Sequence, residues 1–171
     1  MELMRQFKVG DLIVHPHYGV GQVVEIAQNQ FSKQKLCLYY KITLPKRVIW
    51  IPVETHKGPG LRLVTAKGEL DQYRNLLRSP ALALPKNYHQ RHLELDKRLK
   101  EGSFQVLCEV VRDLTAANSQ KALGSKDAAT LRKTRESLCE EWAAAAGLSV
   151  AEAVKEVGTL LEVAQPYPEV V

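Results

Sequence analysis

The stretch FKVGDLIVHPHYGVGQVVEI, residues 7–26, decides the fold that this sequence predicts. It holds two short segments rich in valine and isoleucine, and Pro16, Gly19 and Gly21 lie between or at the edges of these segments. Proline offers a strand ladder no N–H donor, and glycine permits positive φ, so we expect the backbone itself to bend here. Two strands joined by such a bend, over residues 12–15 and 20–27, are typical of a small, strongly curved β-barrel.

Three more strands are predicted further along the chain. Residues 36–42 follow a period of two, a Leu-Pro-Lys-Arg turn precedes an apolar segment over 48–53, and residues 61–64 form a short closing strand. Five short strands indicate an SH3-like or Tudor-like barrel.

After Thr65 the apolar period changes from two to about 3.6, which indicates helices. Ser125 is expected to cap the fourth helix. Ser149 and Glu152 form a capping-box pattern for the fifth, in which Val154 is expected to be buried. The expected helices cover residues 69–78, 86–100, 103–117, 125 up to Gly147, and 149 onwards.

The predicted fold therefore has two domains, an N-terminal all-β SH3/Tudor-like small barrel and an all-α domain of about five helices. The expected boundaries are residues 1–66 for the barrel, 67–165 for the helical domain and 166–171 for a flexible tail.

The composition bounds the class of protein. The chain has 171 residues, of which 45% are hydrophobic and 25% charged, as in ordinary globular proteins. No apolar run approaches the length of a membrane span, so we expect a cytoplasmic protein without a membrane partner. The three cysteines are far apart in apolar surroundings, which favours reduced core thiols. The net charge of +5 does not by itself identify DNA as a partner.

No signature of catalysis is present, since the phosphate-binding, dinucleotide-binding, nucleophile-elbow and zinc-protease motifs are all missing from the sequence. We therefore expect no enzyme activity and no cofactor. His15 and His17 share a strand face and could be joined by His56 or Cys37 as zinc ligands. Only one close pair exists, so the favoured interpretation is a strand-end histidine that hydrogen-bonds a turn, and no metal site is predicted.

The segment over residues 48–53 is apolar on both faces. Ile49, Ile51 and Val53 share one face, and Val48 and Trp50 share the other. A barrel has one interior, so two interpretations stay open: the second face docks a partner, or Trp50 packs against the helical domain.

The second expected helix is basic and carries Tyr88 in its first turn. The backbone N–H groups at its N-terminus, after Pro85, are free and favour binding of a phosphate. Tyr88 shares a stripe with Leu95 and Leu99, and periodicity alone favours a core position for it; the other interpretation is an exposed ring beside the cations. The basic residues are Lys86, His89, Arg91, His92, Lys97, Arg98 and Lys100.

Several motifs in combination resemble the CarD-like (CdnL) bacterial transcription regulators, whose first domain also occurs in the transcription-repair coupling factor. The chain lacks any counterpart of that factor's ATPase motor. The motifs are Phe7-Lys8-Val9-Gly10-Asp11, Val14-His15-Pro16-His17-Tyr18-Gly19-Val20-Gly21, Ile51-Pro52-Val53-Glu54, Leu84-Pro85-Lys86-Asn87-Tyr88 and Glu109-Val110-Val111-Arg112-Asp113-Leu114.

The resemblance implies that the barrel docks on the β subunit of RNA polymerase and that the helical domain contacts promoter DNA. In the family a Trp within a Pro-x-Asn-Trp motif wedges into the minor groove at the upstream edge of the bubble, and Tyr88 stands at its place. The implied DNA-binding residues are Tyr88, Lys86, Arg91, His92, Lys97, Lys133 and Arg135. The implied polymerase-binding residues are Arg47, Val48, Trp50, Ile51 and Pro52.

The expected function is thus a monomeric transcription regulator that stabilises the promoter open complex, in the cytoplasm and at the nucleoid through RNA polymerase. Two other functions stay open. One is a protein-only adapter with Tyr88 buried in its helices. The other is a KOW-like RNA-binding protein, because part of the opening stretch also occurs in such modules.

Overall fold

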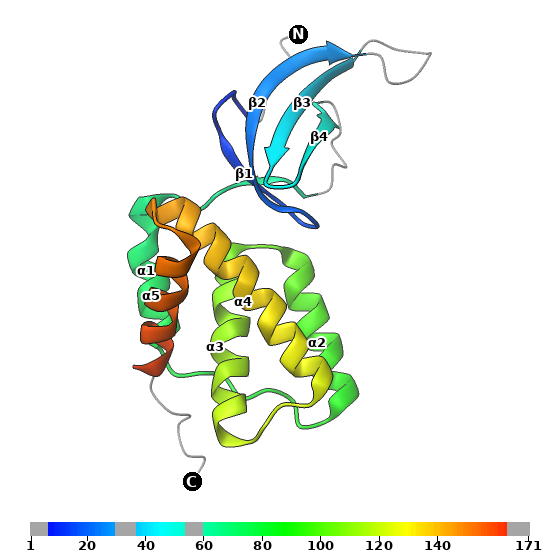
Figure 1. Cartoon of the computed structure of the whole chain (residues 1–171). Helices are drawn as coiled ribbons and strands as arrows, with labels where there is room; N and C mark the ends of the chain where they lie inside the picture. The colour runs from blue at the N-terminus through cyan, green and yellow to red at the C-terminus, as the bar shows by residue number, and fades with distance from the viewer. Residues whose placement is uncertain (1–6, 30–36, 54–59, 164–171) are drawn as a thin grey trace. The chain divides into compact units, whose positions relative to one another are not determined.

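The computed structural model describes residues 7–29, 37–53 and 60–163, which form an all-β unit followed by an all-α unit (Figure 1). The division falls between Val64 and Thr65, close to the expected one between residues 66 and 67. The predicted tail, residues 166–171, lies outside the described residues. The predicted fold class is confirmed, since the described residues form a five-stranded antiparallel sheet followed by five α-helices. Among the described residues, no helix combines the length and the apolarity that crossing a bilayer requires.

The sheet has the strand order β4-β3-β2-β1-β5, and every neighbouring pair is antiparallel. The strands are β1 (Leu12–His15), β2 (Gly19–Asn29), β3 (Cys37–Leu44), β4 (Arg47–Pro52) and β5 (Arg62–Leu63). The core of the unit consists of Phe7, which precedes β1, and of strand residues Ile13, Val23, Tyr40, Ile42, Leu44 and Ile51. Within the described part of the chain, β4 pairs only with β3 and is therefore an edge strand.

The bend in β1–β2 has a different origin from the one predicted at Gly21. Gly19 has a positive φ of 78°, as expected, but Gly21 does not, so that part of the prediction is wrong. A Cβ placed on Gly21 would lie 2.8 Å from side-chain atoms of Ile42 and Leu44, so glycine is needed there for close packing against β3. A β-bulge at Val24 shifts the register between β2 and β3 by one residue, because Val23 pairs with Ile42 and Glu25 with Lys41, and it bends β2 further.

Gly21→Ala is therefore expected to destabilise the sheet by about 1–3 kcal/mol through overpacking. The methyl group would meet two side chains and the Thr43 carbonyl oxygen at 3.0 Å. Hydrogen exchange of peptides from β2 and β3 measures the effect. Val24→Ala, an exposed neighbour on the same strand, is the control and should cost little. Equal exchange in Gly21→Ala and the parent protein would contradict the packing argument.

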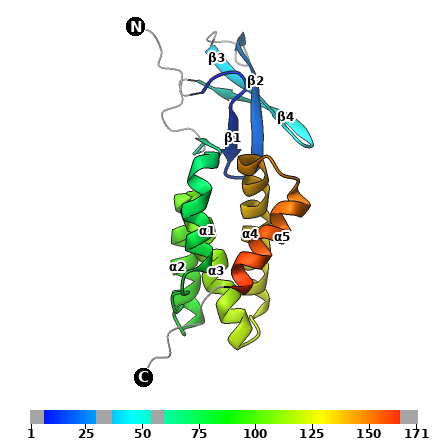
Figure 2. The same ribbon diagram turned by 90° about the vertical axis from the view of Figure 1, so that its left-hand side faces the viewer.

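The helical unit is built around α3, which contacts α1, α2 and α4, while α5 packs against α1 and α4 (Figure 2). Its elements are a 3₁₀ turn at Lys67–Glu69, then α1 (Leu70–Arg78), α2 (Tyr88–Glu101), α3 (Phe104–Gln120), α4 (Ser125–Ala146) and α5 (Val150–Glu162).

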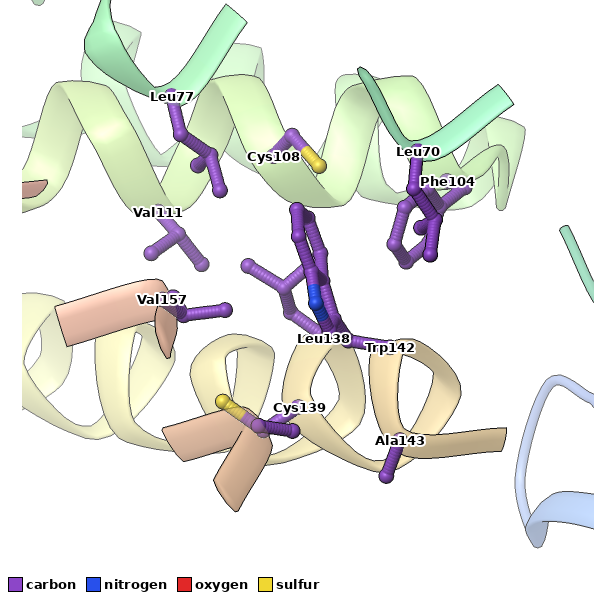
Figure 3. Packing of buried hydrophobic residues seen from close by; sticks show 11 residues of the cluster. Leu70, Leu77, Phe104, Cys108, Val111, Leu138, Cys139, Trp142, Ala143 and Val157 are labelled. Carbon is purple, nitrogen blue, oxygen red and sulfur yellow. The ribbon is translucent and has the colours of Figure 1, made fainter. Parts of the chain in front are cut away.

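Trp142 of α4 lies at the centre of the largest core cluster, near Cys108 and Phe104 of α3 (Figure 3). Its indole N–H donates to Glu156 Oε2 at 3.1 Å, and Arg74 Nε donates to Oε1 of the same carboxylate at 2.7 Å. The buried indole therefore has its polar atom paired, and one side chain of α5 is tied to both α1 and α4.

Two local predictions for α4 and α5 are wrong, and one is confirmed. Gly124, not Ser125, is the N-cap of α4 and makes no side-chain cap bond. Val154 is exposed, because the buried face of α5 runs through Ala153 and Val157 instead. The capping box of Ser149 and Glu152 is present in both directions.

The three cysteines are free thiols, with Cys37 half-buried and the other two buried. Burial raises the pKa of the Cys108 and Cys139 thiols, so both are held in the unreactive protonated form at neutral pH.

Candidate functional site

Tyr88 is the first residue of α2 and is 51% exposed. The helix begins there because Asn87 is its N-cap, with Oδ1 accepting from the Gln90 N–H at 3.1 Å. The ring packs against His92, one turn later, with centroids 4.1 Å apart in an edge arrangement. Tyr88 is therefore supported on one side and open on the other, and the core position that periodicity alone favoured is wrong.

Arg91 lies beside this ring, and its guanidinium holds the start of the helix together. The Cζ atom is 5.9 Å from the Tyr88 ring centroid, at the outer range of a cation–π contact. Nε donates to Asp127 Oδ2 at 2.9 Å, and Nη1 donates to the carbonyl oxygens of Pro85 at 3.0 Å and Lys86 at 3.2 Å. One side chain thus joins α2, the segment before it and the first turn of α4.

His92, predicted as a DNA contact, is buried beneath Tyr88. Its Nε2 atom lies 3.5 Å from Asp127 Oδ1, and neither atom has a hydrogen-bond partner among the residues that the structure describes. Asp127 is also buried, so its carboxylate faces both Arg91 and His92 from across the helix interface. Asp127 was missed by sequence reasoning, and the available signal was an acidic residue in the first turn of α4, where the helix dipole favours it.

The remaining predicted DNA-binding residues are spread over two helices. Lys86 is exposed just before α2, Lys97 is exposed further along the same helix, and Lys133 is exposed in the middle of α4. Arg135 is half-buried, and a Cβ placed on Gly158 of α5 would lie 3.3 Å from its Nη2 atom. The structure thus brings together Tyr88 and the two residues beneath it, and does not gather all seven predicted residues into one cluster.

A buried ionic network fixes the segment that leads into α2. Asp113 of α3 is fully buried, and its carboxylate accepts from Arg112 Nε at 2.9 Å, Arg98 Nη2 at 3.1 Å and the Leu82 N–H at 3.0 Å. The network joins α2, α3 and the segment after α1. The motif at residues 109–114 is therefore structural, since its polar members build this network and Val110, Val111 and Leu114 enter the core.

Strand β4 separates the predicted polymerase-binding residues by face. Ile51 is buried and Ile49 packs on the same core, whereas Val48 is 49% exposed on the outward face. Trp50 is half-buried on that outward face, with Lys41 Nζ 5.3 Å from its ring centroid. Arg47 is exposed and its Cζ lies 4.7 Å from the Tyr18 ring. The edge strand thus presents apolar, aromatic and cationic groups together.

His15 makes the turn contact that was favoured over zinc binding. Its Nδ1 atom accepts from the His17 N–H at 3.0 Å, and its ring stacks on Tyr18 with centroids 4.6 Å apart. Burial, and then the nearby His17, lower the pKa of His15 below its ordinary value of 6.5. Within residues 7–29, 37–53 and 60–163, no three His, Cys, Asp or Glu side chains are grouped to hold a metal ion. His56 lies outside the described residues.

Comparison with known families identifies both units. Residues 7–63 match the CarD-like/TRCF RID domain, an RNA polymerase-binding module, and residues 72–158 match the CarD C-terminal domain. The chain therefore belongs to the CarD-like family of transcription factors, which are not enzymes. It is 26% identical over 136 residues to the protein named "Putative transcription factor YdeB" of Bacillus subtilis (strain 168). That alignment covers 79% of this chain and 89% of the relative.

Proposed function

We propose that this protein docks on the β subunit of RNA polymerase through β4 and stabilises the promoter open complex by contacting DNA with the head of α2. The observation that carries the proposal is the half-exposed ring of Tyr88, supported from beneath by His92 and Arg91, in a chain of the CarD-like family. Acting there would place the protein in the cytoplasm, at the nucleoid.

The proposed mechanism is differential binding. An aromatic ring that inserts between base steps of the minor groove needs bases that are already partly unstacked, as they are at the upstream edge of a melted promoter. A protein that binds the melted state more tightly than the closed state shifts the equilibrium by that difference. A difference of about 1.4 kcal/mol raises the ratio of open to closed complex about tenfold, and it lengthens the lifetime of the open complex by the same factor when the transition state for closing is not stabilised.

Exposed cations before α2, on α2 and on α4 supply the sequence-independent part of the proposed contact. Lys86, Lys97 and Lys133 are exposed and can each neutralise one phosphate. Because such contacts are few, affinity for DNA alone is expected to be weak, and it should fall as salt is added because these contacts release counterions. Attachment to polymerase raises the local concentration of DNA beside α2, so the protein acts only where both partners are present.

The docking half of the proposal predicts that Val48→Asp weakens polymerase binding by about tenfold or more. A carboxylate on the outward face of β4 would be desolvated without a partner in a strand-edge interface. Leu63→Asp is a matched control, because Leu63 is 51% exposed on the opposite edge strand. Binding of each variant to purified polymerase measures the effect. Equal losses for both variants would contradict docking through β4.

The two other functions remain distinguishable by experiment. The adapter without DNA contact required a buried Tyr88, and the exposed ring favours the DNA contact instead. The family matches favour polymerase over a KOW-like RNA partner. The test is the lifetime of promoter open complexes formed by purified polymerase, with and without the protein. A longer lifetime supports the proposal, and an unchanged lifetime despite polymerase binding would leave only an adapter.

A further inference from the structure

We infer that Asp127 is a positioning residue for Tyr88, and that Arg91 acts with it as a clamp instead of binding a DNA phosphate. This inference rests on the proposed function of Tyr88 as the DNA-contacting ring. It assigns a role to the N-terminus of α4. The resemblance to the family implied no role for this part of the helix.

The contacts run from the buried carboxylate to the exposed ring. Asp127 Oδ2 accepts from Arg91 Nε at 2.9 Å, and its Oδ1 atom faces His92 Nε2 at 3.5 Å. Those two side chains lie against the Tyr88 ring, at centroid distances of 5.9 Å for Arg91 Cζ and 4.1 Å for the His92 ring, and the His89 ring lies 5.6 Å from it. One buried group therefore bonds Arg91 and lies against His92, two of the side chains around the ring.

The geometry of Arg91 favours a clamp over a phosphate contact. Two of its nitrogens are used within the protein, by one carboxylate and two backbone carbonyls, and the side chain is only 21% exposed. The carbonyls belong to Pro85 and Lys86, directly before the helix, so the clamp also sets where α2 begins. A planar guanidinium can make these three bonds at once, whereas the single ammonium nitrogen of a lysine cannot reproduce this planar arrangement of donors.

Electrostatics and positioning predict opposite effects for Asp127→Ala. Removing a negative charge near a DNA-binding surface should strengthen DNA binding if charge alone matters. If Asp127 positions the ring, the same change releases Arg91 and His92 and weakens the effect on the open complex. The sign of the change therefore separates the two explanations.

The experiment measures open-complex lifetime with the full-length protein and purified polymerase, comparing Asp127→Ala, Arg91→Lys, Arg91→Ala and Tyr88→Ala. We expect all four variants to lose most of the lengthening, with Arg91→Lys as impaired as Arg91→Ala. Glu136→Ala is the matched control, since it removes an exposed carboxylate from the same helix and should leave the lifetime unchanged. If Arg91→Lys retains the parent activity while Arg91→Ala loses it, Arg91 acts through its charge and the clamp is wrong.

A second measurement is independent of function. In the parent protein, NMR should detect contacts between the ring protons of Tyr88 and His92, and these should weaken in Asp127→Ala and in Arg91→Lys. Unchanged ring contacts would overturn the inference. If Tyr88→Ala itself has no effect on the lifetime, the proposed function fails, and the ring contacts still decide whether Asp127 positions Tyr88. If Asp127→Ala does not fold, Arg91→Lys provides both readouts.

Discussion

Tyr88→Ala is expected to abolish the lengthening of open-complex lifetime while leaving binding to RNA polymerase unchanged. The ring is 51% exposed at the head of α2, and its removal takes away the group that would insert beside unstacked bases. Stacking between a base and an aromatic side chain contributes about 1–3 kcal/mol by alanine substitution. The lifetime should therefore fall by about fivefold to more than a hundredfold, towards the value without the protein. Dissociation of preformed promoter complexes after addition of a competitor measures it.

Two variants on the same helix sharpen this test. Tyr88→Phe keeps the ring and loses only the hydroxyl, so it should retain most of the effect. Leu93→Ala removes another large exposed side chain of α2, 71% exposed, and should change the lifetime little if Tyr88 has a specific role. Loss of polymerase binding in Tyr88→Ala, or an equal loss of lifetime in Leu93→Ala, would contradict a wedge.

Asp113→Ala is expected to destabilise the helical unit by about 3–5 kcal/mol, the usual cost of breaking a buried ion pair by removing one partner. Asp113 is fully buried and pairs with Arg112 and Arg98, so its loss takes the carboxylate from Arg112 and, among the described residues, leaves Arg98 with only the partly exposed Glu109. The backbone N–H of Leu82 loses its acceptor as well, which frees the segment before α2. Urea denaturation followed by helical circular dichroism measures the loss.

Glu109→Ala is the control for that variant. Glu109 also pairs with Arg98, at 3.4 Å, but its side chain is partly exposed, so its removal should cost under about 1 kcal/mol. Equal destabilisation by the two substitutions would contradict the assignment of Asp113 as the centre of the network.

The order of elements could be predicted from the sequence because the apolar period changes once, from two to about 3.6. The strand predicted over residues 12–15 is β1 without change, and the capping-box pattern at Ser149 marks the start of α5. The bulge at Val24 could not be predicted from the sequence. One extra residue in a strand that already contains neighbouring apolar residues leaves no distinct sequence pattern. The role of Gly21 depends on side chains of β3, which are remote in sequence.

The candidate site was predicted in part. Tyr88 lies on the stripe of Leu95, but it is the first residue of its helix, where no preceding turn covers it, and periodicity does not include that end effect. The family resemblance indicated an exposed ring, as found. The partners of Asp127 and Asp113 on other helices, Arg91 and Arg98, are remote in sequence, so these contacts could not be predicted from local patterns.

The central claim is that residue 88 touches promoter DNA while the protein is bound to polymerase. A photo-crosslinking phenylalanine derivative at position 88, in place of Tyr88, tests this in open complexes formed with purified polymerase. The account predicts crosslinks to DNA at the upstream edge of the bubble, and their loss when Val48→Asp prevents docking. Crosslinks to polymerase alone would contradict it. Crosslinks to DNA that persist when Val48→Asp prevents docking would contradict it as well.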